Sequence, residues 1–113
     1  MDCIFCKIAA GEIPAKKVLE NEHVVAFHDL NPHAPVHVLV IPRRHVESVG
    51  SAGEGDAELL GHVLLACRKV AEETGVAESG FRVVLNTNAD AGQSVAHLHA
   101  HVLGGRRLGW PPG

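Results

Sequence analysis

Three histidines alternate with apolar residues near the C-terminal end of the chain. The segment 97–102 reads His-Leu-His-Ala-His-Val, so one apolar side chain separates each of His97, His99 and His101 from the next. On a β-strand this alternation places the three imidazoles on one face, about 6.5–7 Å apart. They could hold a catalytic metal, or the middle imidazole could attack phosphorus while its neighbours manage charge and protons. A plain water-facing strand is the third alternative.

A short polar loop before these histidines favours the second chemistry. Gly92, Gln93 and Ser94 offer a permissive glycine, two backbone N–H groups and a hydroxyl, which suit an anion-binding nest for phosphate. A metal hydrolase would need a nearby carboxylate as general base, and Asp90 is the only close candidate in the sequence. The sequence therefore favours nucleophilic chemistry on phosphate, with His99, the one histidine flanked on both sides, as the attacking group.

Two cysteines near the start of the chain form a second constellation. Cys3 and Cys6 have the Cys-x-x-Cys spacing of half a structural zinc site, which two histidines close in space would have to complete. The alternative is a pair of small, half-buried thiols on a short helix. The cysteine count is odd and the first residues lack the character of a secretion signal, so we expect a reducing, cytoplasmic compartment.

Length and composition bound the remaining possibilities. The 113 residues, with a mass of 12.0 kDa, fit one domain spanning 1–113. An apolar content of 46% supports a core, and 20% charged residues exclude a disordered, charge-solvated chain. A net charge of −3 argues against nucleic acid as a partner, and no apolar run reaches the roughly 20 residues of a membrane span.

The elements that must position these residues can be read from periodicity and from Gly and Pro punctuation. The pattern predicts helices over 3–10 and 56–74, strands over 15–20, 23–29, 36–41, 81–85 and 95–103, a loop over 86–94 and a tail over 104–113. These elements indicate an α+β fold, an antiparallel five-stranded sheet with a short N-terminal helix and one long helix packed on one face. An exposed helix face and a strand edge favour pairing into a homodimer.

The histidine motif and several others resemble one known family. The pattern His97-x-His99-x-His101, followed by Val102-Leu103, is similar to the signature of the histidine triad (HIT) superfamily. Further similar motifs are Ile13-Pro14-Ala15-Lys16, Ala26-Phe27-His28-Asp29, Ala34-Pro35, Val40-Ile41-Pro42, Ala91-Gly92-Gln93-Ser94, Gly104-Gly105-Arg106 and Trp110-Pro111-Pro112-Gly113. The similarity runs from about Ile4 to Gly113, and the tail selects the nucleotide-binding, phosphoramidase branch.

That resemblance implies an activity and roles for individual residues. Enzymes of this branch hydrolyse the P–N bond of purine nucleoside phosphoramidates through a covalent nucleotidyl-histidine, for which the matching residue is His99. By the same resemblance His101 contacts the phosphate, His97 and His37 orient and polarise the site, and Ser94 donates to the phosphate or the leaving nitrogen. The implied nucleotide contacts are Asn86, Gly92 and Gln93 with phosphate oxygens, Asp29 and Leu30 with the ribose, and Ile4, Phe5, Ile8, Phe27 and Leu39 with the purine.

The resemblance also bears on metal, partners and alternatives. Many bacterial relatives with the N-terminal cysteine pair bind structural zinc at positions that match Cys3, Cys6, His45 and His97, while no catalytic metal is required. Such zinc would occupy a nitrogen of His97. The implied partners are a purine nucleotide (AMP, GMP or a phosphoramidate) and a second copy of the chain, with the Trp110 segment reaching the partner's site. A nucleotide-binding scaffold with little catalytic role is the alternative.

Overall fold

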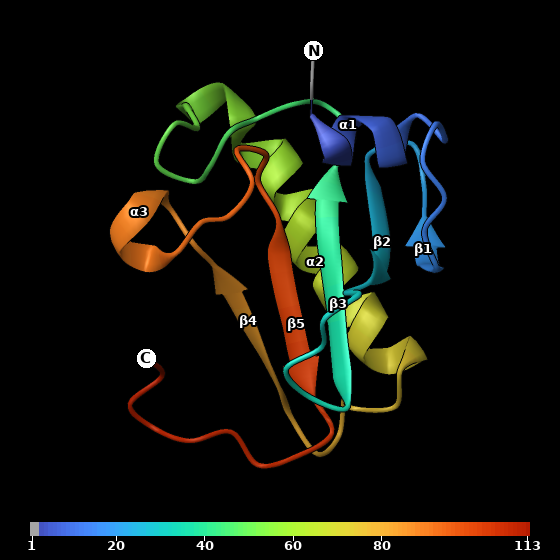
Figure 1. The fold of residues 1–113 in the computed structure, drawn as a ribbon, viewed down its shortest axis with the longest axis vertical. Helices are drawn as coiled ribbons and strands as arrows, with labels where there is room; N and C mark the ends of the chain where they lie inside the picture. Colours follow the sequence, from blue (N-terminus) through green and yellow to red (C-terminus); the bar gives the residue numbers. More distant parts are fainter. Residues whose placement is uncertain (1–2) are drawn as a thin grey trace.

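Five strands form one antiparallel sheet in the order β1-β2-β3-β5-β4 (Figure 1). The computed structural model describes residues 3–113. The strands are β1 Lys17–Glu20, β2 Val24–His28, β3 Val36–Pro42, β4 Phe81–Leu85 and β5 Ala100–Gly104. The predicted α+β class and the five-stranded antiparallel sheet are confirmed.

The helices differ greatly in length. They are α1 Ile4–Ala9, the 3₁₀ turn η1 Glu54–Asp56, α2 Ala57–Glu73 and the single turn α3 Asn88–Ala91. The long helix buries one stripe against the sheet, made of Val63, Ala66, Cys67, Val70 and Ala71. These positions repeat every three or four residues, as expected for one face of an α-helix. The short N-terminal helix and the one long helix are therefore confirmed.

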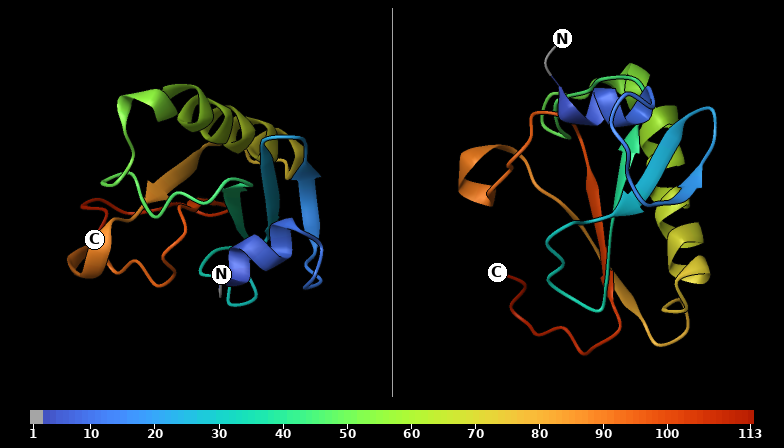
Figure 2. Two further views of the ribbon diagram at one scale, coloured as in Figure 1. Left: turned by 90° about the horizontal axis from the view of Figure 1, so that it is seen from above. Right: turned by 45° about the vertical axis from the view of Figure 1, so that its right-hand side comes forward.

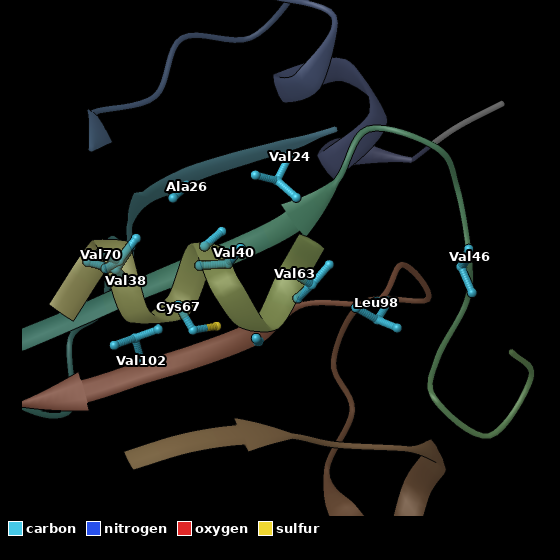
Figure 3. Packing of buried hydrophobic residues seen from close by; sticks show 12 residues of the cluster. Val24, Ala26, Val38, Val40, Val46, Val63, Cys67, Val70, Leu98 and Val102 are labelled. Atoms are coloured by element: carbon cyan, nitrogen blue, oxygen red, sulfur yellow. The ribbon is translucent and has the colours of Figure 1, made fainter. Parts of the chain in front are cut away.

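The central strands are buried on both faces, so the sheet carries two apolar layers. In β3, Val38 and Val40 belong to the cluster under α2, whereas Leu39 and Ile41 belong to a cluster with Phe5 of α1. Figure 3 shows the first cluster between α2 and the sheet. Alternate side chains of a strand point to opposite faces, so the apolar run from Val38 to Ile41 needs cover on both sides.

The two main helices lie on opposite faces of the sheet. In the left view of Figure 2, α2 runs along one side of the strands and α1 lies on the other. The prediction that the helices share one face is therefore wrong. Its physical reason is the unbroken apolar run of β3, which one helix layer could not cover.

The last strand is shorter than the sequence predicts. Regular pairing begins at Ala100, because the Leu98 N–H donates to the Val46 carbonyl at 2.7 Å instead of to a neighbouring strand. The predicted strand over 95–103 is thus wrong for its first five residues, and the predicted loop over 86–94 contains α3. The face alternation survives nonetheless, since Leu98 and Val102 both lie in the cluster under α2. Within residues 3–113, no helix is long and apolar enough to cross a membrane.

Candidate active site

The histidine at the centre of the alternating segment has a defined tautomer. His99 is 5% exposed, and its Nδ1 lies 2.7 Å from the carbonyl oxygen of His97. A carbonyl only accepts hydrogen bonds, so the neutral His99 ring carries its proton on Nδ1 and its lone pair on Nε2. The ring also packs edge-on against Phe5, with centroids 5.1 Å apart. The fold therefore holds this imidazole in one orientation, with Nδ1 as its donor nitrogen.

A chain of hydrogen bonds fixes the neighbouring pair, His37 and His101. The backbone N–H of His33 donates to Nδ1 of His37 at 3.0 Å, so His37 carries its proton on Nε2. That Nε2 lies 2.9 Å from Nδ1 of His101 and 3.4 Å from a carboxylate oxygen of Asp29. His37 therefore donates to His101, and His101 in turn carries its proton on Nε2.

Burial keeps this pair neutral near pH 7. Burial lowers the pKa of His37, although the Asp29 carboxylate opposes the shift. Burial, with the nearby rings of His99 and His37, lowers the pKa of His101 to about 4. Burial disfavours the protonated form of both imidazoles, because a charged ring is poorly solvated in a buried site. His101 is thus a neutral N–H donor, not a cation, at physiological pH.

The cavity beside these histidines has an apolar part and a polar end. Its volume is about 290 Å³. Ten of the expected nucleotide-site residues line it: Ile4, Phe5, Ile8, Phe27, Asp29, Leu30, Leu39, Ser94, His99 and His101. Most of the apolar side chains come from α1, β2 and β3. Of the polar ones, Asp29 follows β2, Ser94 and His99 precede β5, and His101 lies in β5. This arrangement suits a ligand with a flat apolar body and an anionic end.

Five lining residues were not among those the sequence analysis assigned to the site. They are Ile13, Pro14, Ala15, Lys16 and His28. The first four follow α1, and one of the motifs similar to the histidine triad family contains all four, which was the available signal. His28 precedes Asp29 at the end of β2, and another of these motifs contains it.

Three expected phosphate contacts lie outside the cavity lining: Asn86, Gly92 and Gln93. The N–H groups of Gly92 and Gln93 donate to the carbonyls of Ala89 and Asn88, at 2.9 and 3.1 Å. The Gln93 side chain donates to the carbonyls of Glu47 and Val95. These groups hold the α3 loop together, so the expected nest of free amides is not formed here. Ser94, in contrast, lies in the lining.

The first histidine of the motif points to a different cluster. His97 is fully buried, and its Nε2 donates to the Pro42 carbonyl at 2.9 Å. Its Nδ1 lies 3.3 Å from Sγ of Cys3, 3.5 Å from Sγ of Cys6 and 3.0 Å from Nδ1 of His45. Both ring nitrogens are engaged away from the cavity. The expectation that the His97 ring orients and polarises the site is therefore corrected. The backbone carbonyl of His97, not its ring, orients His99 by accepting a hydrogen bond from Nδ1.

The four side chains of this Cys/His cluster fit a tetrahedral metal. The donor atoms of Cys3, Cys6, His45 and His97 all lie within 4.8 Å of one another. A zinc ion bound at about 2.3 Å to sulfur and about 2.0–2.1 Å to nitrogen would separate its ligand atoms by about 3.3–3.8 Å. Burial of His97 lowers its pKa and keeps it neutral, while burial and the neighbouring Cys3 raise the pKa of Cys6, so a thiolate there calls for an adjacent cation.

The third cysteine is separate from this cluster. Cys67 lies in the core under α2, and burial raises the pKa of its thiol to about 11. It is therefore a packing residue.

Comparison with known proteins agrees with this geometry. The family model of the HIT domain matches residues 10–108. An uncharacterized HIT-like protein of Synechocystis sp. is 49% identical over 112 residues, which cover 99% of this chain and 97% of the relative. The crystal structure of a HIT family hydrolase from Legionella pneumophila superposes with a TM-score of 0.96 at 46% identity, covering 99% and 100% of the two chains. A histidine triad protein from Clostridium difficile gives 0.93 at 48% identity, with 96% and 95% covered.

Proposed function

The chain belongs to the HIT domain family, and we propose that it hydrolyses the P–N bond of purine nucleoside 5′-phosphoramidates through a covalent nucleotide on His99. The observation that carries this proposal is the tautomer of His99. Its protonated Nδ1 is held by the His97 carbonyl, which leaves the lone pair of Nε2 free at the polar end of an otherwise apolar cavity. A buried, oriented and unprotonated imidazole is what nucleophilic attack on phosphorus requires.

The proposed reaction has two displacements at phosphorus. In the first, Nε2 of His99 bonds to phosphorus, the bond to the leaving nitrogen breaks, and that nitrogen takes a proton, for which the Ser94 hydroxyl is the nearby donor. In the second, water attacks phosphorus and returns a proton to the Ser94 oxygen, the bond to His99 breaks and the nucleoside monophosphate leaves. His101, with its proton on Nε2, can donate to a phosphate oxygen throughout, because fixed N–H dipoles stabilise developing negative charge.

The cavity also fits the nucleoside part of such a substrate. Phe5, Ile8 and Phe27 offer an apolar, partly aromatic wall for a purine. Asp29 keeps one carboxylate oxygen on the Asn31 N–H at 2.8 Å, and its other oxygen faces His37, so it has acceptor capacity left for ribose hydroxyls. AMP, GMP or the corresponding phosphoramidates are the ligands that this arrangement suits.

A metal-dependent hydrolase that uses the three alternating histidines as ligands fits the geometry less well. His97 directs its Nδ1 towards Cys3 and Cys6, whereas His99 and His101 line the cavity. Three rings that diverge in this way do not surround one ion. A nucleotide-binding scaffold with little catalysis would need the cavity but not the His99 tautomer, so turnover separates it from the enzyme.

For the Cys/His cluster we propose one structural zinc ion on Cys3, Cys6, His45 and His97. Support comes from the S₂N₂ donor set and from the His97 Nε2–H bond to Pro42, which fixes the ring so that Nδ1 is free to ligate. When bound, the zinc would have four protein ligands and would join α1 to the segment before β5. It would take no part in the chemical step.

We also propose that two copies of the chain form a homodimer. Leu64 and Leu65 on the outward face of α2 are 52% and 56% exposed, and β4 is an edge strand. The tail residue Trp110 is 83% exposed and available to contact a second copy.

The proposed activity is tested by turnover of an adenosine 5′-phosphoramidate. We expect His99→Asn to lower turnover by about a thousandfold or more while AMP still binds, because only the nucleophile is lost. His62→Asn, a histidine change on α2 away from the cavity, is the matched control and should turn over as the wild type does. Turnover by His99→Asn within tenfold of wild type would contradict the mechanism, and loss of activity on chelation with the fold intact would favour the metal hydrolase.

A further inference from the structure

The six arginines of the chain fall into two groups of three. Arg43, Arg44 and Arg68 each pair with a carboxylate, from Glu20, Asp56 and Glu72 respectively. Among residues 3–113, Arg82, Arg106 and Arg107 make no ion pair. These last three line one hollow, which we call the arginine hollow. Three uncompensated guanidinium groups at one place are unexpected in a chain whose net charge is −3.

The arginine hollow forms where the ends of two strands meet. Phe81, the first residue of β4, pairs with Gly104, the last residue of β5, so the segments beside them lie at the same end of the sheet (Figure 1). The hollow has a volume of about 360 Å³, and its remaining lining residues are Ser79, Gly80, Phe81 and Leu108. No carboxylate lines it, and it shares no residue with the cavity beside His99.

Two of the arginines are held in place by backbone carbonyls. Arg82 donates from Nη2 to Gly109 at 2.8 Å, and Arg106 donates from Nη2 to His33 at 3.0 Å. A neutral carbonyl orients a guanidinium without cancelling its charge. Since each guanidinium has five N–H donors, most donors of Arg82 and Arg106 remain free for a ligand. No carboxylate therefore neutralises these guanidinium groups, yet backbone carbonyls hold the side chains of Arg82 and Arg106 in place.

We propose that the arginine hollow binds a short phosphate chain of the pyrophosphate class. Three positive charges, two of them held in place, match the about three negative charges that pyrophosphate carries near neutral pH. Guanidinium forks pair bidentately with phosphate oxygens, and a phosphate chain offers enough acceptors in a small space for three forks at once. A lone carboxylate offers two oxygens, and orthophosphate has less charge. This site is independent of the reaction proposed at His99.

Calorimetric titration of the full chain in a low-salt chloride buffer tests the assignment. We expect pyrophosphate to bind, orthophosphate and citrate to bind at least tenfold more weakly, and added NaCl to weaken binding because the contact is electrostatic. Arg107→Gln and Arg82→Gln should each weaken pyrophosphate at least tenfold. Arg68→Gln removes the same charge from the surface of α2 and serves as the matched control, with affinity unchanged.

Each other outcome overturns the proposal in a defined way. Pyrophosphate affinity unchanged in both Arg107→Gln and Arg82→Gln would place any binding elsewhere. Loss of pyrophosphate binding in His99→Asn, or by saturation with AMP, would assign it to the cavity beside His99. Equal affinity for citrate would show that the arginine hollow binds polyanions in general and does not select a phosphate chain. Thermal unfolding of each variant without ligand confirms that the folded protein is being compared.

Discussion

Hydrogen-bond acceptors around the histidines decide what each imidazole can do. His97 and His99 are two residues apart, yet one gives its lone pair to the Cys/His cluster and the other presents it to the cavity. The difference arises because Nε2 of His97 meets the Pro42 carbonyl, whereas Nδ1 of His99 meets the carbonyl of His97. Two carbonyl oxygens thus assign the two tautomers, and this separates the proposed ligand role of His97 from the proposed nucleophilic role of His99.

The depressed pKa of His101 predicts a pH dependence of stability. In the unfolded chain His101 titrates near its ordinary 6.5, and in the folded protein its pKa is about 4. Between these values the unfolded chain binds a proton that the folded protein does not, so the free energy of unfolding falls as pH falls from about 6.5 to about 4. At about 1.4 kcal/mol per pH unit the window corresponds to about 3 kcal/mol. Because His101 is only half-buried, solvent screening reduces the loss that we expect from this one group to about 1–2 kcal/mol.

Urea unfolding at several pH values measures that contribution. The His101→Gln variant should lose part of the slope between pH 6.5 and 4, while its slope above pH 7 should match the wild type. An identical slope for both proteins below pH 6.5 would contradict the buried, neutral state of His101.

At this scale the sequence predicted the residue types better than their orientation. The alternation around His99 placed the right side chains at the cavity, because period two operates even where the strand is irregular. The alternation could not show that His97 diverges, since this depends on carbonyls of Pro42 and His97 whose positions only the folded chain defines; only the family resemblance implied it, by grouping His97 with the two cysteines. That the amides of Gly92 and Gln93 donate to carbonyls within their own loop could not be predicted either, because only the folded chain places those carbonyls.

Among the elements, α1 links the Cys/His cluster to the cavity. Cys3 caps the helix by accepting the Cys6 N–H at 3.3 Å, and Phe5 lies between them in the sequence and packs on Phe27 and His99. A helix of six residues has little stability of its own in water. Its position must therefore come from this packing and from the Cys/His cluster at its start.

Removal of the two thiols tests that dependence. We expect the double variant Cys3→Ser, Cys6→Ser to lose bound zinc and to unfold at a temperature lower by several degrees, because metal-ligand bonds contribute directly to folding free energy. Phosphoramidate chemistry at His99 should persist, since the zinc takes no part in it. Elemental analysis of protein purified without added metal and thermal unfolding are the measurements.

The control is Cys67→Ala, which should keep one zinc per chain because Cys67 lies in the core. Zinc content near zero in the wild type, or unchanged in the double Ser variant, would remove the metal site from the account.

The elements themselves were predictable where a pattern was long. The helical spacing of apolar residues from Leu59 to Ala71, with Gly75 after it, predicted α2 almost to its ends, and the apolar run of β3 predicted a central strand. The late start of β5 pairing, at Ala100, was not predictable, because it follows from a long-range bond between Leu98 and Val46. The strand order, with β5 between β3 and β4, is likewise a tertiary property.

For the whole molecule, the unpartnered surfaces predict a pair of chains. The outward leucines of α2 and the free edge of β4 would both be covered in a twofold dimer, the commonest closed assembly. Light scattering at micromolar concentration should give about twice the 12.0 kDa of one chain. The double variant Leu64→Glu, Leu65→Glu should shift the mass towards one chain, whereas Val49→Glu, at a residue 43% exposed outside α2, should not. A single-chain mass for the wild type would contradict the predicted dimer.

The measurement that tests the central claim most directly is intact-protein mass spectrometry during turnover. Wild-type protein mixed with an adenosine phosphoramidate and quenched within seconds at alkaline pH should carry one added adenylyl group, and peptide mapping should place it on His99. The His99→Asn variant should carry none. Turnover with no nucleotide on His99, or the same added mass in His99→Asn, would contradict the account.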